Sequence, residues 1–248
     1  MAAPPQGQTV VRAPDPGYVV RDLARMSQAR NYQRWQFDLV AGHLGQRILE
    51  VGCGTGNFTQ FLADRSHVHG IDIESACVDR FRRRFADQPH LTAQVMDVLA
   101  AEFPSLASQR FDTIICLNVL EHIRDDAETL RRFHGILPPG GRVALMVPAF
   151  EALHGPIDDH LGHYRRYTKR SLSELGASTG FRVRASRYFN FAGGIGWWVN
   201  ARVIPRTEQS TGQIALFDSV IVPVMSAVEK YIPLPFGQSV LGILEKAA

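Results

Sequence analysis

Short β-branched segments that alternate with longer amphipathic segments are the feature of this 248-residue sequence that most limits its fold. From Arg47 to Val147, each apolar run is followed by a charge-bearing segment whose apolar residues recur at helical spacing. Strands that alternate with helices are typical of βαβ units, which form parallel sheets with right-handed crossovers. We therefore predict an α/β fold with a doubly wound, Rossmann-like sheet that collects its ligands at the carboxyl ends of its strands.

The same pattern predicts the element boundaries. We expect a flexible leader at 1–16 and a single domain over 17–248, and the Pro-Pro-Gly-Gly run at 138–141 ends a helix before the next strand. The expected strands are 47–51, 68–71, 92–96, 113–117, 143–147, 181–188 and 238–244. The expected helical segments are an N-terminal cap at 17–44, then 57–65, 75–86, 126–136 and 169–179, with substrate-side insertions that are irregular at 148–168 and helical at 190–236.

Composition excludes several classes of protein. Lys and Arg total 27 against 24 Asp and Glu, so the net charge of +3 gives no reason to expect a nucleic-acid partner. The three cysteines (Cys53, Cys77 and Cys116) form no CxxC pair, which favours a reducing cytoplasm over a disulfide scaffold. Polar residues and glycines interrupt the apolar stretch 188–204, so we expect no integral membrane span there, and we read no signal peptide at the N-terminus.

A glycine loop follows the first expected strand. Gly52, Gly54 and Gly56 alternate with other residues, and a carboxylate, Glu50, precedes them. A dinucleotide fingerprint would place its third glycine at Asn57, and no Lys-Ser/Thr pair follows as a phosphate-binding Walker loop requires. A carboxylate beside the loop suits a ligand with a cationic end better than a pyrophosphate. The alternative is a tight structural turn without a ligand.

Polar residues also stand at the ends of the next three expected strands. Asp72 ends the second, where a carboxylate can accept both hydroxyls of a ribose. Asp97 follows the third, where it can accept the amine of adenine while Ile73 and Val98 sandwich the ring. Asn118 ends the fourth. Any one of these residues could be a simple helix cap, but their succession at one sheet edge favours a shared ligand site.

This succession resembles the class I S-adenosylmethionine-dependent methyltransferases over roughly residues 30–190. The matching residues are Leu49–Gly56, Gly70–Asp72, Asp97, Phe111–Ile115, Asn118–His122 and Leu137–Gly141. The resemblance implies a seven-stranded mixed sheet whose last strand is antiparallel, with S-adenosyl-L-methionine as methyl donor. It also implies that Glu50, Gly52 and Gly54 lie at the methionine part of the donor, Asp72 at its ribose and Asp97 at its adenine.

Two further points concern this resemblance. Tyr32 looks like the aromatic residue that many such enzymes close over the donor. The helical stretch 190–236 departs from the common core, which has only a short link there, and it leaves the substrate pocket open.

Candidates for acceptor chemistry follow the fourth and fifth strands. A histidine can accept a proton near neutral pH, so His163 is the first candidate for a general base, His122 is the second, and His160 is placed at the substrate. The alternative for each is a hydrogen-bonded structural role. We expect no metal, because the carboxylates and histidines of 158–163 crowd into six residues without a distant ligand.

Basic and aromatic residues surround these histidines. The cluster at 165–170 could clamp an anionic acceptor group, or it could be the solvated start of a helix. The aromatics of 188–198 could wall an acceptor pocket, rest peripherally on a membrane, pack a homodimer, or fill the core of the insertion. The substrate-side candidates are Tyr164, Arg165, Tyr188 and Trp197.

Our leading hypothesis is therefore O- or N-methylation of a small-molecule acceptor, such as a secondary metabolite or a cell-envelope precursor. A second hypothesis keeps the fold and makes the acceptor a protein or RNA. A third is non-catalytic, a donor-binding interaction subunit that uses the 190–236 insertion as its interface.

Overall fold

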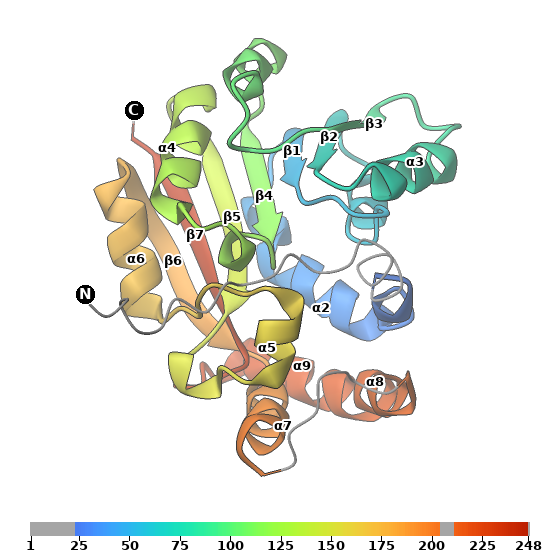
Figure 1. Ribbon diagram of the computed structural model, residues 1–248, viewed down its shortest axis with the longest axis vertical. Helices are drawn as coiled ribbons and strands as arrows, with labels where there is room; N and C mark the ends of the chain where they lie inside the picture. The colour runs from blue at the N-terminus through green and yellow to red at the C-terminus, as the bar shows by residue number, and fades with distance from the viewer. Residues whose placement is uncertain (1–22, 204–210, 248) are drawn as a thin grey trace, which may run out of the picture.

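A seven-stranded mixed sheet forms the centre of the computed structural model, which describes residues 23–203 and 211–247 (Figure 1). The strand order is β3-β2-β1-β4-β5-β7-β6, and neighbours are parallel except that β7 runs antiparallel to both β5 and β6. This confirms the predicted α/β class and the antiparallel last strand. The strands are β1 (Arg47–Val51), β2 (His67–Asp72), β3 (Leu91–Val95), β4 (Thr113–Leu117), β5 (Arg142–Pro148), β6 (Phe181–Phe189) and β7 (Ser239–Lys246).

Helices cover both faces of the sheet. On one face Phe133 and Leu172 pack into a cluster with residues of β4 and β5. On the other face Phe81 packs against β1 and β2, and Trp35 packs against Met146 of β5. The helices are α2 (Arg30–Val40), α3 (Ser75–Arg84), α4 (Asp126–Ile136), α5 (Pro156–Leu161), α6 (Lys169–Ser178), α7 (Phe191–Arg202), α8 (Thr211–Leu216) and α9 (Val222–Tyr231), with 3₁₀ turns η1 (Ala41–His43), η2 (Thr59–Leu62), η3 (Phe103–Gln109), η4 (Leu120–His122) and η5 (Glu151–Leu153), and a π-helical turn η6 (Phe217–Ile221).

Three expected elements are corrected by the structure. The helix expected at 57–65 is only the 3₁₀ turn η2, whose Thr59 hydroxyl is engaged by Glu50. The segment 148–168 is not irregular throughout, because it contains η5 and α5. The cap at 17–44 is not one helix in its described part: a short helical turn precedes α2, which begins at Arg30. The leader at 1–16 lies outside the described residues.

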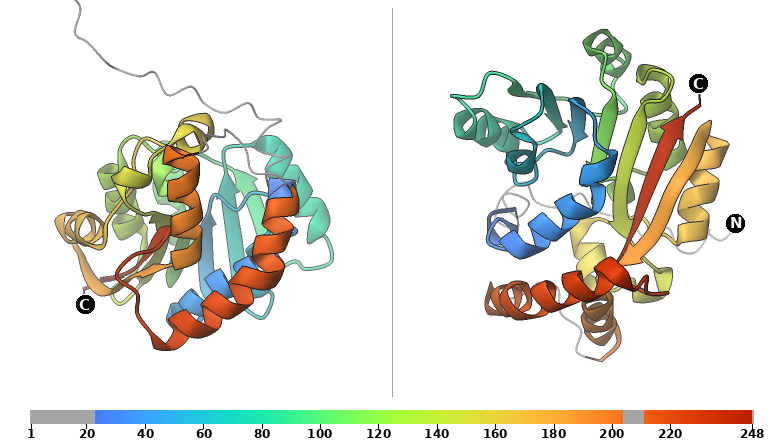
Figure 2. Two further views of the ribbon diagram at one scale, coloured as in Figure 1. Left: turned by 90° about the horizontal axis from the view of Figure 1, so that it is seen from below. Right: turned by 180° about the vertical axis from the view of Figure 1, so that it is seen from behind.

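The insertion before the last strand is helical, as predicted, and lies beside α2 at one end of the molecule (Figure 2). Two buried carboxylates attach it to the domain. Asp218 accepts hydrogen bonds from the backbone N–H groups of Asn31 and Tyr32, at the start of α2. Glu229 accepts from those of Asn190 and Phe191, at the start of α7. The insertion is therefore part of the same packed unit as the sheet.

The continuous helix Gly212–Tyr231 has the length and apolar composition that could cross a membrane, and 17% of its most apolar window is buried. It is a different stretch from the one weighed in the sequence. Its carboxylates at Asp218 and Glu229 are turned into the protein, whereas its outer side exposes a line of apolar residues. These are Leu216, Val220, Val224, Val228 and Tyr231.

Candidate active site

The glycine loop connects β1 to η2 through three residues of positive φ. Gly52, Gly54 and Gly56 have φ values of +72°, +52° and +79°, a region that side chains make costly. Space excludes a side chain as well, because a Cβ on Gly52 would lie 2.2 Å from Cγ2 of Val119. The N–H groups of Gly52 and Cys53 donate to the Ile71 carbonyl, which fastens the loop to β2. The sequence therefore needs glycine here for geometry, whatever the loop binds.

Glu50 lies beneath this loop, almost fully buried. The hydroxyl of Thr59 donates to its Oε2 over 2.6 Å. Burial raises the pKa of Glu50 to about 8, although the bond from Thr59 opposes the shift. A carboxyl group in this state favours a cation nearby, because a positive charge would offset the cost of ionising it.

Asp72 ends β2 beside the loop. Its Oδ2 accepts from the N–H of Gly54 at 2.8 Å, and its Oδ1 accepts from that of Glu74 at 2.9 Å. Burial raises the pKa of Asp72, and these backbone bonds oppose the rise. The carboxylate is thus held in a fixed orientation, and each oxygen keeps a lone pair for a ligand hydroxyl.

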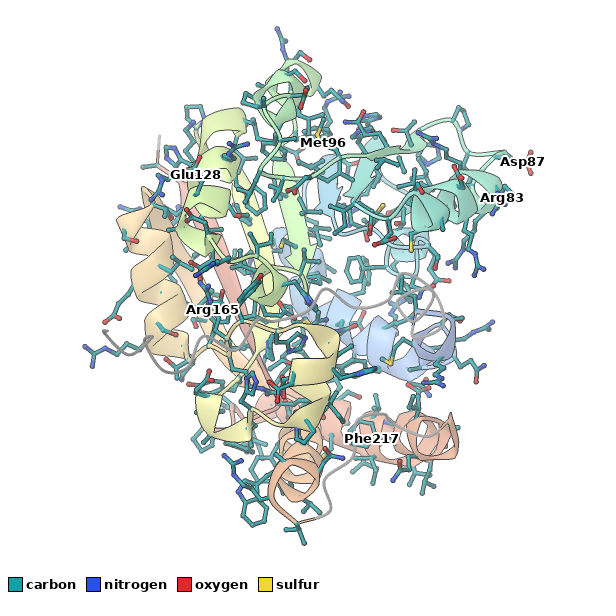
Figure 3. The ribbon with its side chains drawn as sticks, in the orientation of Figure 1. Arg83, Asp87, Met96, Glu128, Arg165 and Phe217 are labelled. Atoms are coloured by element: carbon teal, nitrogen blue, oxygen red, sulfur yellow. The ribbon has the colours of Figure 1, made fainter. Side chains whose placement is uncertain are left out.

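A pocket of about 500 Å³ opens at the end of β3. Asp97 stands in its wall, and its Oδ1 is fixed by the N–H of Leu99 at 2.8 Å. Val98 does not line the pocket as we expected: its side chain is buried in the core, and Met96 (labelled in Figure 3) takes that place in the wall. The lining residues are Ile73, Val95, Met96, Asp97, Ala100 and Glu102. This wall combines apolar surface with one oriented carboxylate, a composition that suits adenine.

The residue over the glycine loop differs from our expectation. Tyr32 packs against Phe189, with ring centroids 6.4 Å apart, and hydrogen bonds with Asn190 and Ser239 at the far strands β6 and β7. Leu23 lies over Gly54 instead, and its carbonyl accepts from Nδ2 of Asn57. In this arrangement Tyr32 does not cover the donor loop. The sequence resemblance did not indicate Leu23.

Asn118 ends β4 with a φ of +54°, which turns the chain into η4. Its N–H donates to the Met146 carbonyl of β5 at 2.7 Å. The residue after it, Val119, is the one that contacts Gly52. The turn that carries Glu121 and His122 therefore begins directly against the glycine loop.

A buried carboxylate, Asp158, organises the segment after β5. Arg166 donates to it in a fork, Nε to Oδ1 at 2.9 Å and Nη2 to Oδ2 at 3.0 Å. Nδ1 of His163 lies 2.8 Å from Oδ1, and Nε1 of Trp197 donates to Oδ2. Burial alone would raise the pKa of Asp158, but His163 and Arg166 hold it at about 2. Asp158 is therefore ionised and fixes the orientation of the His163 ring.

His163 meets the turn after β4. Its ring lies 4.6 Å from that of His122, and the N–H of Tyr164 donates to the Glu121 carbonyl. Burial raises the pKa of Glu121 to about 7, and burial together with His163 lowers the pKa of His122 to about 4. The fold thus brings together the two histidines that were named from the sequence. The carboxylate of Glu121, which sequence analysis did not single out, lies beside them.

The remaining substrate-side candidates have mixed outcomes. Arg165 (Figure 3) donates to Asp126 at 2.6 Å and to the Arg124 carbonyl, and Arg166 donates to Asp158, so these two arginines of the basic cluster form internal pairs. His160 and Tyr164 are exposed. Tyr188 is buried in a stack with Phe150.

Sequence reasoning missed three residues at this site. Glu121 was given no role, Asp158 was considered only as part of a metal site that we did not expect, and Arg166 was grouped with a basic cluster that could clamp an anion or begin a helix. Their positions in the sequence could have indicated a role. Glu121 neighbours His122, and Asp158 precedes His163 by one helical turn and a glycine. Burial, which turns these residues into a network, is a property of the fold.

Known proteins match the part of the chain that contains the glycine loop and the acidic strand ends. Residues 49–143, from β1 to β5, match the methyltransferase domain family. The ubiquinone biosynthesis O-methyltransferase of Aeromonas salmonicida is 29% identical over 164 residues, which cover 60% of this chain and 68% of that protein. The protein of the same name from Pseudomonas aeruginosa is 36% identical over 112 residues, 42% of this chain and 45% of that protein. The chain thus spans about half to two thirds of the length of these relatives.

Solved structures share the fold. A methyltransferase from Mesorhizobium loti superposes with a TM-score of 0.55 at 18% identity, covering 86% of this chain and 98% of that one. The N-methyltransferase NodS of Bradyrhizobium japonicum, solved with S-adenosyl-L-homocysteine, superposes with a TM-score of 0.55 at 16% identity, covering 88% of this chain and 87% of that one. Together with the glycine loop, Asp72 and the sequence matches, these findings define the class. Residues 49–143 are a methyltransferase domain, and the chain has the fold of the class I S-adenosylmethionine-dependent methyltransferases, enzymes whose cofactor is S-adenosyl-L-methionine.

Proposed function

We propose that this protein transfers the methyl group of S-adenosylmethionine to a hydroxyl oxygen of a small-molecule acceptor. One observation carries the proposal: the buried His163–Asp158 pair faces the Glu121–His122 turn, which begins against the donor loop through the contact of Val119 with Gly52. A proton acceptor next to the donor is what methylation of a hydroxyl group requires.

The chemistry asks little else of the protein. Methyl transfer from a sulfonium is an in-line displacement with an activated leaving group, so the protein must align the reactants, exclude water and remove the proton of a hydroxyl acceptor. Ionised Asp158 accepts Nδ1–H of His163, which leaves the lone pair on Nε2. In our proposal this Nε2 faces the acceptor oxygen.

The names of the relatives support an oxygen acceptor, because the Aeromonas and Pseudomonas proteins are described as O-methyltransferases. The three cysteines are free and buried, which supports our assignment to a reducing compartment, the cytoplasm.

Release of S-adenosylhomocysteine tests the proposal, with phenol, catechol and aliphatic alcohol acceptors compared with primary amines. We expect turnover with hydroxyl acceptors, and a loss of about 10²–10⁴-fold in His163→Ala, the range of a general base. Binding of S-adenosylhomocysteine should persist in this variant, and His90→Ala, a histidine remote from the site, should match the wild type. Turnover with amines alone, or full activity in His163→Ala, would contradict the proposal.

A further inference from the structure

Three potential ligands from two distant segments converge at one point. Glu121 and His122 belong to η4, and His163 follows α5 some forty residues later in the chain. One ligand atom from each residue lies within 4.8 Å of the other two. The sequence argued against a metal because it lacked a distant ligand, and the fold supplies one.

A carboxylate oxygen in this cluster has no hydrogen-bond partner among the residues that the structure describes. It is Oε2 of Glu121, whose side chain is 1% exposed. A buried acceptor without a partner is destabilising, and more so when it is charged, which indicates that an additional group such as a water or an ion binds there. Glu121 is also the residue whose carboxylate could bind a metal ion together with the two histidines.

The orientation of His163 matches that of a metal-binding histidine. Such histidines almost always donate their second ring N–H to a carboxylate or carbonyl, which leaves the other nitrogen for the metal. Nδ1 of His163 meets Oδ1 of Asp158 at 2.8 Å, so Nε2 is the nitrogen that remains. Arg166, Trp197 and the N–H of Gly155 hold Asp158 in turn, so the histidine is oriented before any ligand arrives.

The local charge also favours a cation. The fork between Arg166 and Asp158 neutralises that carboxylate, and the Arg165–Asp126 pair is likewise balanced. Among the residues that the structure describes, no side-chain cation forms an ion pair with Glu121. An ionised Glu121 would therefore leave one negative charge at the point where two imidazoles converge.

We propose that Glu121, His122 and His163 bind a divalent transition-metal ion, with Zn²⁺ as the first choice. Two imidazoles and one carboxylate are a ligand set that such ions share, and this set leaves a position open. Tetrahedral bonds of about 2.0–2.2 Å place ligand atoms about 3.4 Å apart, and the three ligand atoms here lie within 4.8 Å of one another. This inference rests on the proposed function and refines it. With the ion bound, Nε2 of His163 is a metal ligand instead of the base, and the open position would hold the acceptor oxygen, lower the pKa of its hydroxyl group and let its proton pass to solvent.

Cobalt titration tests the site independently of activity. Tag-free protein, treated with chelator and desalted, is titrated with Co²⁺, followed by its visible absorption and by metal analysis. We expect about one Co²⁺ per chain, displaced by Zn²⁺. His122→Ala and His163→Ala should each lower the affinity more than tenfold, since even residues behind the ligands change it by about 10–100-fold.

The matched control is His90→Ala, which should bind Co²⁺ like the wild type. Because a buried histidine variant can fail to fold, the isosteric Glu121→Gln is measured too, and thermal unfolding of each variant is recorded. Absent Co²⁺ binding, or equal binding in Glu121→Gln and the wild type, overturns the site. Full turnover of metal-free protein overturns the role in the reaction while leaving the proposed function intact, whereas Co²⁺ binding without turnover of any acceptor contradicts that function and leaves the site.

Discussion

Glu50 shows how one buried residue can link the stability of the fold to pH. The folded protein holds its proton up to a pKa of about 8, whereas the ordinary value is 4.5. Between these two values the folded chain keeps a proton that the unfolded chain has lost. The contribution of Glu50 to stability therefore falls as the pH rises from 4.5 to 8, by at most about 1.4 kcal/mol per pH unit.

The first prediction follows for Glu50→Gln, a neutral replacement of the same shape. As the pH rises from 5 to 8, the free energy of unfolding of the variant should increase relative to that of the wild type, because the variant has no titrating proton at this position. Urea unfolding at several pH values measures this difference, and other titrating groups cancel between the two proteins. Parallel pH profiles would show that Glu50 is ionised throughout.

Asp72 carries the second prediction. Asp72→Ala should weaken binding of S-adenosylhomocysteine by about 10–100-fold, because hydrogen bonds to a charged group contribute roughly 1.5–3 kcal/mol. Isothermal titration calorimetry measures the affinity. Asp79→Ala, on the exposed side of α3, is the matched control and should bind like the wild type. An unchanged affinity in Asp72→Ala would remove the carboxylate from the donor site.

At this scale the sequence predicts donor-side positions better than acceptor-side ones. Asp72 and Asp97 end consecutive strands, so local pattern alone brings them to one edge of the sheet. Asp158 and Glu121 gain their meaning only from burial and from contacts across the fold. Val98 was misjudged for the same reason, since the pattern gives alternation but does not show which side of the loop after β3 faces the core.

Among the elements, two helices depend on carboxylates from elsewhere. The residue before α2, Ala29, has no side chain that can cap it, and Asp218 accepts from the first N–H groups of the helix instead, 187 residues away in the chain. Glu229 adds to the cap that Asn190 provides for α7. The insertion thus positions α2, the helix whose residues pack beside β5 and β7.

The third prediction concerns this cap. Asp218→Ala should lower the free energy of unfolding by about 0.5–2 kcal/mol, as the loss of an N-cap does. Asp38→Ala, which removes only an exposed pair with Arg34 on α2, should change it by less than about 1 kcal/mol. Urea unfolding compares the two. Equal effects would mean that the link between the insertion and α2 contributes nothing beyond a surface charge.

Element boundaries were predicted where local chemistry decides them. Asp125 caps α4 and the Pro-Pro-Gly-Gly run ends it, and both signals are in the sequence. The α-helix predicted for 57–65 was wrong although the apolar residues there have helical spacing. The Thr59 hydroxyl donates to Glu50, and the chain returns to β2 after a single 3₁₀ turn. The break before α2 was missed because the cap comes from Asp218, which no local pattern shows.

For the whole molecule, the order of the strands makes the last one indispensable. β7 lies between β5 and β6, pairing with seven residues of β5 and eight of β6. Its side chains Val240 and Leu244 belong to the core on one face, and Leu241 and Ile243 to that on the other. The final strand therefore joins β6 and α6 to the rest of the sheet.

The fourth prediction is that a chain ending at Gln238 does not fold, although it keeps every residue assigned to the donor and acceptor sites. Without β7, the backbone groups of β5 and β6 that face it lose their partners, and both core faces lose buried apolar side chains. The far-UV circular dichroism signal of helices and strands and the binding of S-adenosylhomocysteine should both be lost. A chain ending at Lys246 is the control and should keep both, because it retains all of β7. Donor binding by the shorter chain would mean that β1 to β5 form an independent folding unit, and that the cores on the two faces of the sheet are not coupled through its last strand.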